Sequence, residues 1–264
     1  MELTVLGATG GTGRQVVQQA LEAGHSVTAV VRDPSRLPVT GAGLTVVTAD
    51  VTDPESLLPA LEGRDAAISA LGPRGRKQAR IAAAGTRAIL SALDTCGVRR
   101  FAAVSAAPVG PLPEGEGVVA RTVLIPLLWA VFRDVYTDLA AMEGEIRRSS
   151  ADWTIVWPPR LTDKPVTGTY RRVGGGNVPH GRSISRADLA HALLAVLDEP
   201  TAGNRAWGLR TSRVGGRYAT PAGRHRSVRD PGRPSVSCFR PVTGQLPRGR
   251  LSGGRVGVRG SRRP

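Results

Sequence analysis

Cysteine and lysine are scarce in this chain of 264 residues, which contains two of each. The two cysteines, Cys96 and Cys238, form no Cys-x-x-Cys pair, and the four histidines are scattered along the chain. The sequence therefore contains no pattern for a disulfide framework and no motif for a metal site. A protein of this composition is expected in a reducing compartment, and we predict a cytoplasmic location.

Long hydrophobic runs are also missing. The most apolar stretch, VLIPLLWAVF at 123–132, is too short to span a bilayer and contains Pro126. Met1 leads directly into an apolar segment, so we expect neither a signal peptide nor a membrane anchor. Within the apolar stretch, Trp129 is expected to face the protein core rather than a ligand.

Acidic residues are nearly absent from one part of the chain, residues 212–264. This segment holds thirteen arginines and a single acid, Asp230, and it supplies most of the formal net charge of +15. A segment rich in Arg, Gly, Pro and Ser buries too little apolar surface to offset the entropy lost on ordering. We therefore predict one domain over 1–211 and a disordered tail over 212–264.

The composition of this tail is what GC-rich codons give when they are read in the wrong frame. We interpret 212–264 as the product of a frameshift or a missed stop, added where a normal terminus would lie. Arginines in a disordered segment attract phosphates, so contact with nucleic acid is expected only nonspecifically and through the tail.

Apolar strands alternate with helical patterns along 1–211. Short apolar runs predict strands at 2–7, 26–31, 44–48, 66–70, 100–104 and 153–157. Helical periodicity predicts helices at 13–23, 54–61, 78–95 and 122–148, and another after Ser185, which is a good N-cap residue. This alternation predicts an α/β fold, a Rossmann-like doubly wound parallel sheet with helices on both faces.

The segment VLGATGGTGRQVV at 5–17 places three glycines between the first strand and the first helix. Such a strand, glycine turn and helix is typical of dinucleotide binding, because glycines permit a tight turn and let a pyrophosphate approach the helix N-terminus. A plain glycine turn is the alternative interpretation.

The end of the second strand bears on the choice of cofactor. Enzymes that bind NAD usually carry Asp or Glu there, whereas this chain has Arg32, followed by Asp33. A guanidinium suits the 2′-phosphate of NADP(H), and Arg36 could add a second contact. We predict that NADP(H) is preferred; Asp33 keeps NAD(H) open, because it could hold the ribose itself.

Several segments together resemble the atypical short-chain dehydrogenase/reductase superfamily. They are GATGGTGRQVVQQALEAGHSVTAVVRDPSRL after residue 6, ADV at 49–51, SALG at 69–72, AVSAAPVG at 103–110, DWTIVWPPRLTDKPVTGTYR at 152–171 and SISRADLAHALLAVLD at 183–198. Within the superfamily the chain is similar to the NAD(P)H-binding, NmrA-like group that includes biliverdin-IXβ reductase/flavin reductase. The likeness covers about 1–210.

The resemblance implies a set of site residues. The pyrophosphate loop would be formed by Gly7, Thr9, Gly10, Gly11, Thr12 and Gly13. The adenosine side and the wall beside the riboses would be formed by Arg32, Arg36, Asp50, Val51, Ala70, Leu71 and Gly72. The nicotinamide end would be formed by Ser105, Pro158 and Pro159, with Arg160 facing the substrate. Ser105 and Arg160 are the two candidates for a role in the reaction.

The chain departs from the superfamily in three places. Tyr136 is followed four residues later by Ala140 rather than by the lysine of a Tyr-x-x-x-Lys relay. Arg160 stands where the mammalian flavin reductase has a histidine, and an arginine would pair with a phosphate or propionate rather than give up a proton. Trp157 stands where close bacterial relatives tend to have arginine.

Two functions remain open from the sequence. The first is an NADPH-dependent reductase of a flat conjugated acceptor such as a flavin, a quinone or a tetrapyrrole, acting by direct hydride transfer. The second is a non-catalytic NmrA-like sensor of NADP(H). We expect a monomer or a weak dimer with a small-molecule acceptor as its partner.

Overall fold

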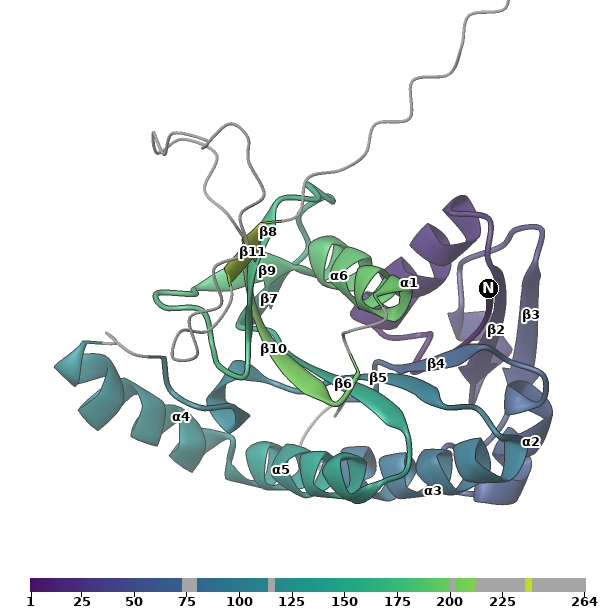
Figure 1. The fold of residues 1–264 in the computed structure, drawn as a ribbon, viewed down its shortest axis with the longest axis horizontal. Coiled ribbons are helices and arrows are strands. Elements are labelled where there is room, and N and C mark those ends of the chain that lie inside the picture. The colour runs from purple at the N-terminus through teal and green to yellow at the C-terminus, as the bar shows by residue number, and fades with distance from the viewer. Residues whose placement is uncertain (73–79, 114–116, 200–202, 212–235, 239–264) are drawn as a thin grey trace, which may run out of the picture.

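The computed structural model describes residues 1–72, 80–113, 117–199, 203–211 and 236–238. In these residues one sheet has the strand order β11-β8-β10-β6-β5-β4-β1-β2-β3 (Figure 1). Its strands are β1 (Glu2–Leu6), β2 (Ser26–Val31), β3 (Leu44–Thr48), β4 (Ala66–Ser69), β5 (Arg100–Val104), β6 (Asp152–Trp157), β8 (Tyr170–Gly174), β10 (Arg205–Thr211) and β11 (Val236–Cys238). A separate parallel pair consists of β7 (Arg160–Thr162) and β9 (Ser183–Ser185).

The sheet is parallel from β3 to β10, and β8 and β11 add an antiparallel edge. The chain order reverses between β1 and β4, as in a doubly wound sheet. All six predicted strands are present, because each is an apolar run long enough to cross a buried sheet. The later strands had no such signal in the sequence, since Arg171 and Arg172 lie within β8 and Arg205 and Arg210 within β10.

Helices cover both faces of the sheet, and the predicted Rossmann-like architecture is confirmed. On one face lie α1 (Gly11–Glu22) and α6 (Arg186–Asp198); on the other lie α2 (Pro54–Leu61), α3 (Ile81–Cys96) and α5 (Arg133–Arg148) (Figure 1). The sequence sets their ends: the Ser185 hydroxyl accepts from the Asp188 N–H at the start of α6, and Gly97 adopts a φ of 70° after α3.

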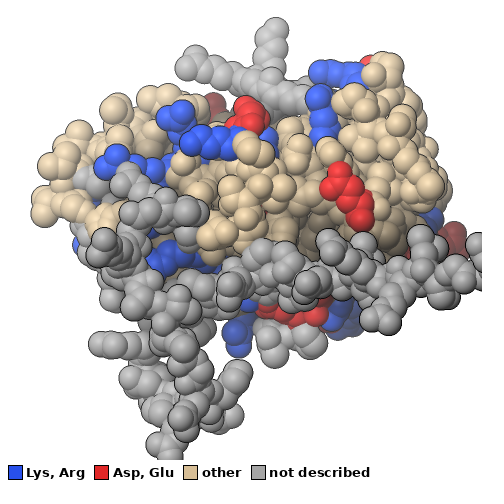
Figure 2. Space-filling view, turned by 90° about the horizontal axis from the view of Figure 1, so that it is seen from above, with Lys and Arg blue, Asp and Glu red and all other residues tan. Residues whose placement is uncertain are grey.

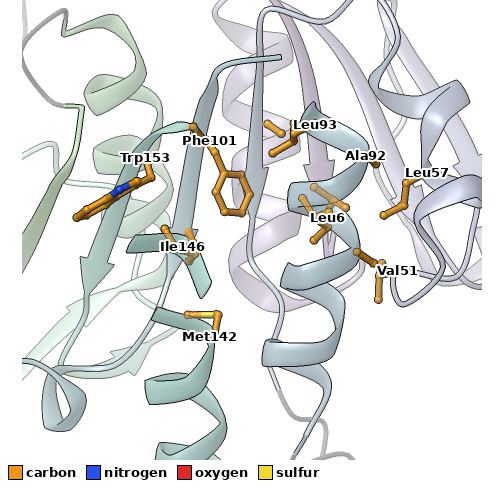
Figure 3. Packing of buried hydrophobic residues seen from close by; sticks show 14 of the residues in the cluster. Leu6, Val51, Leu57, Ala92, Leu93, Phe101, Met142, Ile146 and Trp153 are labelled. Atoms are coloured by element: carbon orange, nitrogen blue, oxygen red, sulfur yellow. The ribbon is translucent and has the colours of Figure 1, made fainter. Parts of the chain in front are cut away.

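The core beneath the second face joins the sheet to α2, α3 and α5. Figure 3 shows Phe101 of β5 between Leu93 of α3 and Ile146 of α5, with Met142 one turn earlier on α5. These side chains are almost fully buried. Burying such side chains contributes about 1.5–3 kcal/mol each, so α5 is held firmly against β5 and β6. This packing places one face of α5 beside the carboxyl end of β5.

The predicted helix 122–148 is divided in the structure. A π-helical turn, η4 (Ala120–Leu124), leads into α4 (Ile125–Val131), and α5 begins at Arg133. No residue of α4 is buried, and Leu127 and Val131 are more than half exposed. The expectation that Trp129 lies in the core was therefore wrong: its indole N–H donates to the carbonyl of Pro108 at 3.0 Å, and the side chain stays partly exposed.

Most of the predicted tail, 212–264, lies outside the described residues. The part of the tail that is described, β11, pairs with β8. On the face shown in Figure 2, the basic and acidic side chains of described residues are scattered among uncharged ones. In the described ranges no helix combines the length and apolar character that a membrane crossing requires.

A chain ending at Ser212 tests how much the remainder contributes. We expect its melting temperature to fall by no more than about 4 °C, because β8 keeps its pairing with β10 and about 1 kcal/mol corresponds to 2–4 °C in a domain of this size. Binding to DNA at low salt should be lost with the thirteen arginines. A fall of more than about 10 °C in differential scanning calorimetry would show that the removed part stabilises the domain by far more than one edge pairing of β11 with β8.

Candidate functional site

The turn between β1 and α1 is closed by glycines that leave no room for side chains. Gly7 has a φ of 76°, and its carbonyl accepts the Gly10 N–H at 2.9 Å. A Cβ on Gly13 would lie 2.2 Å from the same carbonyl oxygen. Since real Cβ atoms do not approach this closely, only glycine lets α1 pack onto the end of β1. Close packing of the helix against the strand is the usual role of the third glycine in a dinucleotide-binding turn.

The N-terminus of α1 opens toward the space above the sheet. The first turn of a helix leaves N–H groups without helical partners, and no side chain caps α1 at Gly10. A Cβ on Gly10 would also lie 3.2 Å from the Gly7 carbonyl, so the loop backbone is bare on this side. Backbone N–H groups at the positive end of a helix bind anions, so this loop fits the pyrophosphate of a dinucleotide.

A cleft of about 350 Å³ runs along the carboxyl ends of β1, β2, β4 and β5. Eleven of the predicted site residues line it: Gly7, Thr9, Gly10, Gly11, Thr12, Arg32, Val51, Ala70, Leu71, Gly72 and Ser105. The other lining residues are Val30, Val31, Ile81, Val104, Leu139, Leu161 and Arg186. The structure therefore brings the glycine loop, Arg32 and Ser105 into one site at the topological switch point.

Asp33, beside Arg32, is committed to the local turn. Its Oδ1 accepts both the N–H and the hydroxyl of Ser35, at 3.1 and 2.7 Å. The Ser35 hydroxyl bond, together with the backbone bond and the nearby Arg36 charge, holds the pKa of Asp33 below its ordinary value. This carboxylate caps a short 3-10 turn, η1 (Pro34–Arg36), and does not line the cleft, whereas Arg32 does.

The remaining predicted residues lie outside the cleft lining. Asp50 precedes Val51, and its Oδ1 accepts the N–H and hydroxyl of Thr52, bonds that lower the pKa of Asp50. Gly13 is buried behind the loop, and the exposed Arg36 lies in η1. The other three are Pro158, Pro159 and Arg160: the Pro158 carbonyl accepts from Ala107 N–H, and Arg160 is exposed at the start of β7.

The side chain that contacts Ser105 was missed from the sequence. Ser105 follows β5, and its hydroxyl donates to the carboxylate of Glu143 on α5 at 2.6 Å. Glu143 is only 5% exposed. The same oxygen accepts the indole N–H of Trp157 at 2.7 Å, and the other oxygen pairs with Arg147 at 2.8 Å. Glu143 lies 38 residues after Ser105 and 14 residues before Trp157, and Arg147 lies one turn further along α5. For this reason no local motif in the sequence marked the cluster.

A model of the NAD(P)H-binding family matches residues 7–200. The chain belongs to this family. The family assignment makes a nicotinamide dinucleotide the cofactor class, without distinguishing NADP from NAD, and it confirms the resemblance to the atypical short-chain dehydrogenase/reductase superfamily.

Individual relatives agree with the family and the fold. The photosystem II assembly factor Ycf39 of Synechocystis is 34% identical over 105 residues, which is 38% of this chain and 32% of Ycf39. The oxidoreductase ylbE of Lactococcus lactis has a TM-score of 0.68 at 19% identity, covering 81% of this chain and 92% of ylbE. ChuY of Escherichia coli, an anaerobilin reductase, has a TM-score of 0.66 at 21% identity, covering 83% and 100%. At 19% and 21% identity, the likeness of this chain to ylbE and ChuY shows a shared fold and nothing more.

A second residue that the sequence did not single out, Arg186, closes the family's glycine loop from the α6 side. It is the first residue of α6, and a Cβ on Gly11 would lie 2.7 Å from its Cδ. Its guanidinium pairs with Asp163 at 2.5 Å. The signal in the sequence was the N-cap Ser185, which fixes where α6 begins and thus which residue faces the loop.

Tyr136 lies away from the cleft. Its ring packs against Trp129 and Phe132, with centroid distances of 5.3 and 5.9 Å, and burial raises the pKa of its phenol. One turn along α5, Leu139 lines the cleft instead. Tyr136 therefore has neither a place in the cleft lining nor the lysine of a Tyr-x-x-x-Lys motif.

Substituting Gly13 tests the glycine turn. Gly13→Ala should lower the free energy of unfolding by about 1–3 kcal/mol, because the added methyl overlaps the Gly7 carbonyl, and it should weaken dinucleotide binding by displacing α1. Urea unfolding and NADPH titration measure both effects. Gly176→Ala is the control, since a Cβ there meets nothing within 4 Å, and both quantities should stay unchanged. Wild-type behaviour of Gly13→Ala would contradict the packing described here.

Proposed function

We propose that the protein is an NADPH-dependent reductase of a flat conjugated acceptor such as a flavin, a quinone or a tetrapyrrole. The observation that supports this most directly is the continuous cleft from the glycine loop through Arg32 to Ser105. One end of this cleft suits phosphates, and the other, near Ser105, is walled mainly by Ile81, Val104 and Leu139. Such a shape suits a charged dinucleotide whose ring end meets an apolar partner.

Each part of the cleft has a separate task in this proposal. The glycine loop and the N-terminus of α1 hold the pyrophosphate, and Arg32 pairs with the 2′-phosphate. The bound nicotinamide supplies the hydride. The apolar walls would exclude water and position a flat acceptor beside the nicotinamide, and such positioning is the main requirement of a direct hydride transfer. Ser105 orients a polar edge of a bound ring at this end of the cleft.

The position of Tyr136 outside the cleft, without a lysine four residues later, favours flat conjugated acceptors over simple ketones. Reducing a ketone requires a proton on the new alkoxide, which the superfamily supplies from an activated tyrosine. A conjugated acceptor spreads the incoming charge over its ring system and can take its proton from solvent. Among proteins that share this fold, ChuY is an anaerobilin reductase, so the proposed activity has a precedent on the scaffold.

A second candidate is a non-catalytic sensor of NADP(H). It is favoured by the contribution of α5 to the cleft, which is the apolar Leu139 rather than Tyr136. The two functions differ in turnover. Oxidation of NADPH followed at 340 nm, with FMN, riboflavin or menadione as acceptor, supports the reductase if any acceptor is turned over. Binding of NADPH without turnover of any of the three supports the sensor.

The cofactor preference depends on Arg32. Arg32→Ala should weaken NADPH binding about tenfold to a hundredfold and leave NADH nearly unchanged, because a charge-assisted phosphate contact is worth roughly 1.5–3 kcal/mol. Isothermal titration with both cofactors measures this. Arg99→Ala, an exposed arginine before β5 at the opposite end of the strands, should change neither affinity. Equal losses for NADPH and NADH would contradict the assignment of Arg32.

Turnover should not depend on Tyr136. Tyr136→Phe is expected to keep its rate with a conjugated acceptor within about twofold, since the phenol lies outside the cleft. Burial raises the pKa of Tyr136 above its ordinary value of about 10, so its phenol stays protonated and adds no step to the pH profile at neutral pH. A thousandfold loss of rate, with an unchanged melting temperature, would reveal a relay through this residue.

A further inference from the structure

The hydrogen bonds around Glu143 fix the direction in which the Ser105 hydroxyl points. Glu143 is buried between α5, β5 and β6, and three donors converge on its carboxylate. The indole of Trp157 and the guanidinium of Arg147 can only donate. Both, together with the positive charge of Arg147, stabilise the ionised carboxylate, which can only accept.

The Ser105 hydroxyl therefore donates its hydrogen bond to Glu143. The distance of 2.6 Å between Ser105 Oγ and Glu143 Oε1 is that of a hydroxyl bonded to a carboxylate. A hydroxyl has one proton and two lone pairs, so Oγ keeps only acceptor capacity for the cleft that it lines. Val104 and Leu139 beside it are apolar, and neither competes for this capacity.

We propose that Ser105 is a hydrogen-bond acceptor for an amide-type N–H group, and that Glu143 is the positioning residue that makes it one. A carbonyl oxygen at the same place would face the lone pairs of Oγ and is disfavoured. This inference rests on the proposed function, because it needs a dinucleotide in the cleft. Two ligands carry the required group: the carboxamide of the nicotinamide, and the ring N–H of a flavin-type acceptor.

The first arm of the test compares cofactor analogues by isothermal titration. The 3-acetylpyridine analogue of NADPH lacks the amide N–H, whereas the thionicotinamide analogue keeps it. Wild-type protein should bind the acetylpyridine analogue about threefold to tenfold more weakly than the thionicotinamide analogue, the net value of one hydrogen bond. In Ser105→Ala this difference should disappear.

The second arm compares acceptors under saturating NADPH. Riboflavin carries a ring N–H that 3-methylriboflavin lacks. If the acceptor supplies the donor, the methylated compound should have a KM about threefold to tenfold higher in the wild type and an equal KM in Ser105→Ala. A difference in the first arm alone assigns the bond to the cofactor, and a difference in the second arm alone assigns it to the acceptor. Either result supports the acceptor role of Ser105.

The role of Glu143 is tested by Glu143→Gln, which keeps the shape of the side chain. The cationic Arg147 retains the single oxygen of a glutamine, so the amide NH2 group faces Ser105. The Ser105 hydroxyl then accepts from this amide and directs its own hydrogen into the cleft. The preference for the N–H ligand should then be lost, while the affinity for the thionicotinamide analogue stays within about threefold. Glu145→Gln is the matched control, because Glu145 lies on the same helix but pairs with Arg87 and Arg148 near the surface.

A merely structural role for Glu143 would lower the melting temperature and leave the preference for the N–H ligand intact, and this result would overturn the proposal for Glu143. Equal behaviour of each pair of probes in the wild type, with NADPH itself bound, would overturn the acceptor role of Ser105 and leave the proposed function standing. Failure of the wild type to bind NADPH at all would overturn both.

Discussion

The close approach of α1 to the end of β1 is the constraint on which the cofactor half of the site depends. A single carbonyl, that of Gly7, accepts the Gly10 N–H and leaves no room for a Cβ on Gly13. The helix N-terminus is thereby held over the carboxyl end of the sheet, where parallel strands direct their loops. The other lining residues reach the same edge because β2, β4 and β5 run parallel to β1.

The opposite end of the cleft depends on a buried charge. Removing a carboxylate from water is costly unless it is paired and hydrogen-bonded, and Glu143 meets this condition through Arg147, Trp157 and Ser105. The three partners come from α5, β6 and the end of β5, so the carboxylate links the helix to two neighbouring strands. At Trp157 the donor to Glu143 is an indole N–H.

The sequence predicts best what short-range physics decides. The six strands were found because each is a short apolar run, five of them buried in the sheet and β3 at its edge, and α6 was found because Ser185 caps it. The division of the helix at Phe132 was missed, since its periodicity continues through that residue although α4 is left exposed. Likewise, nothing beside Ser105 in the chain indicates that its hydroxyl meets Glu143, because tertiary packing alone brings the two together.

Local sequence signals determine one end of the cleft, and tertiary contacts determine the other. Binding a dinucleotide depends on the local glycine turn between β1 and α1. At the other end of the cleft, the hydrogen bonding of Ser105 depends on residues that are distant in the sequence. A change at Trp157 or on α5 can therefore alter which ligand group forms a hydrogen bond with Ser105, without disturbing the glycine turn. Proteins of this fold can therefore differ in activity while their first βα unit stays nearly the same.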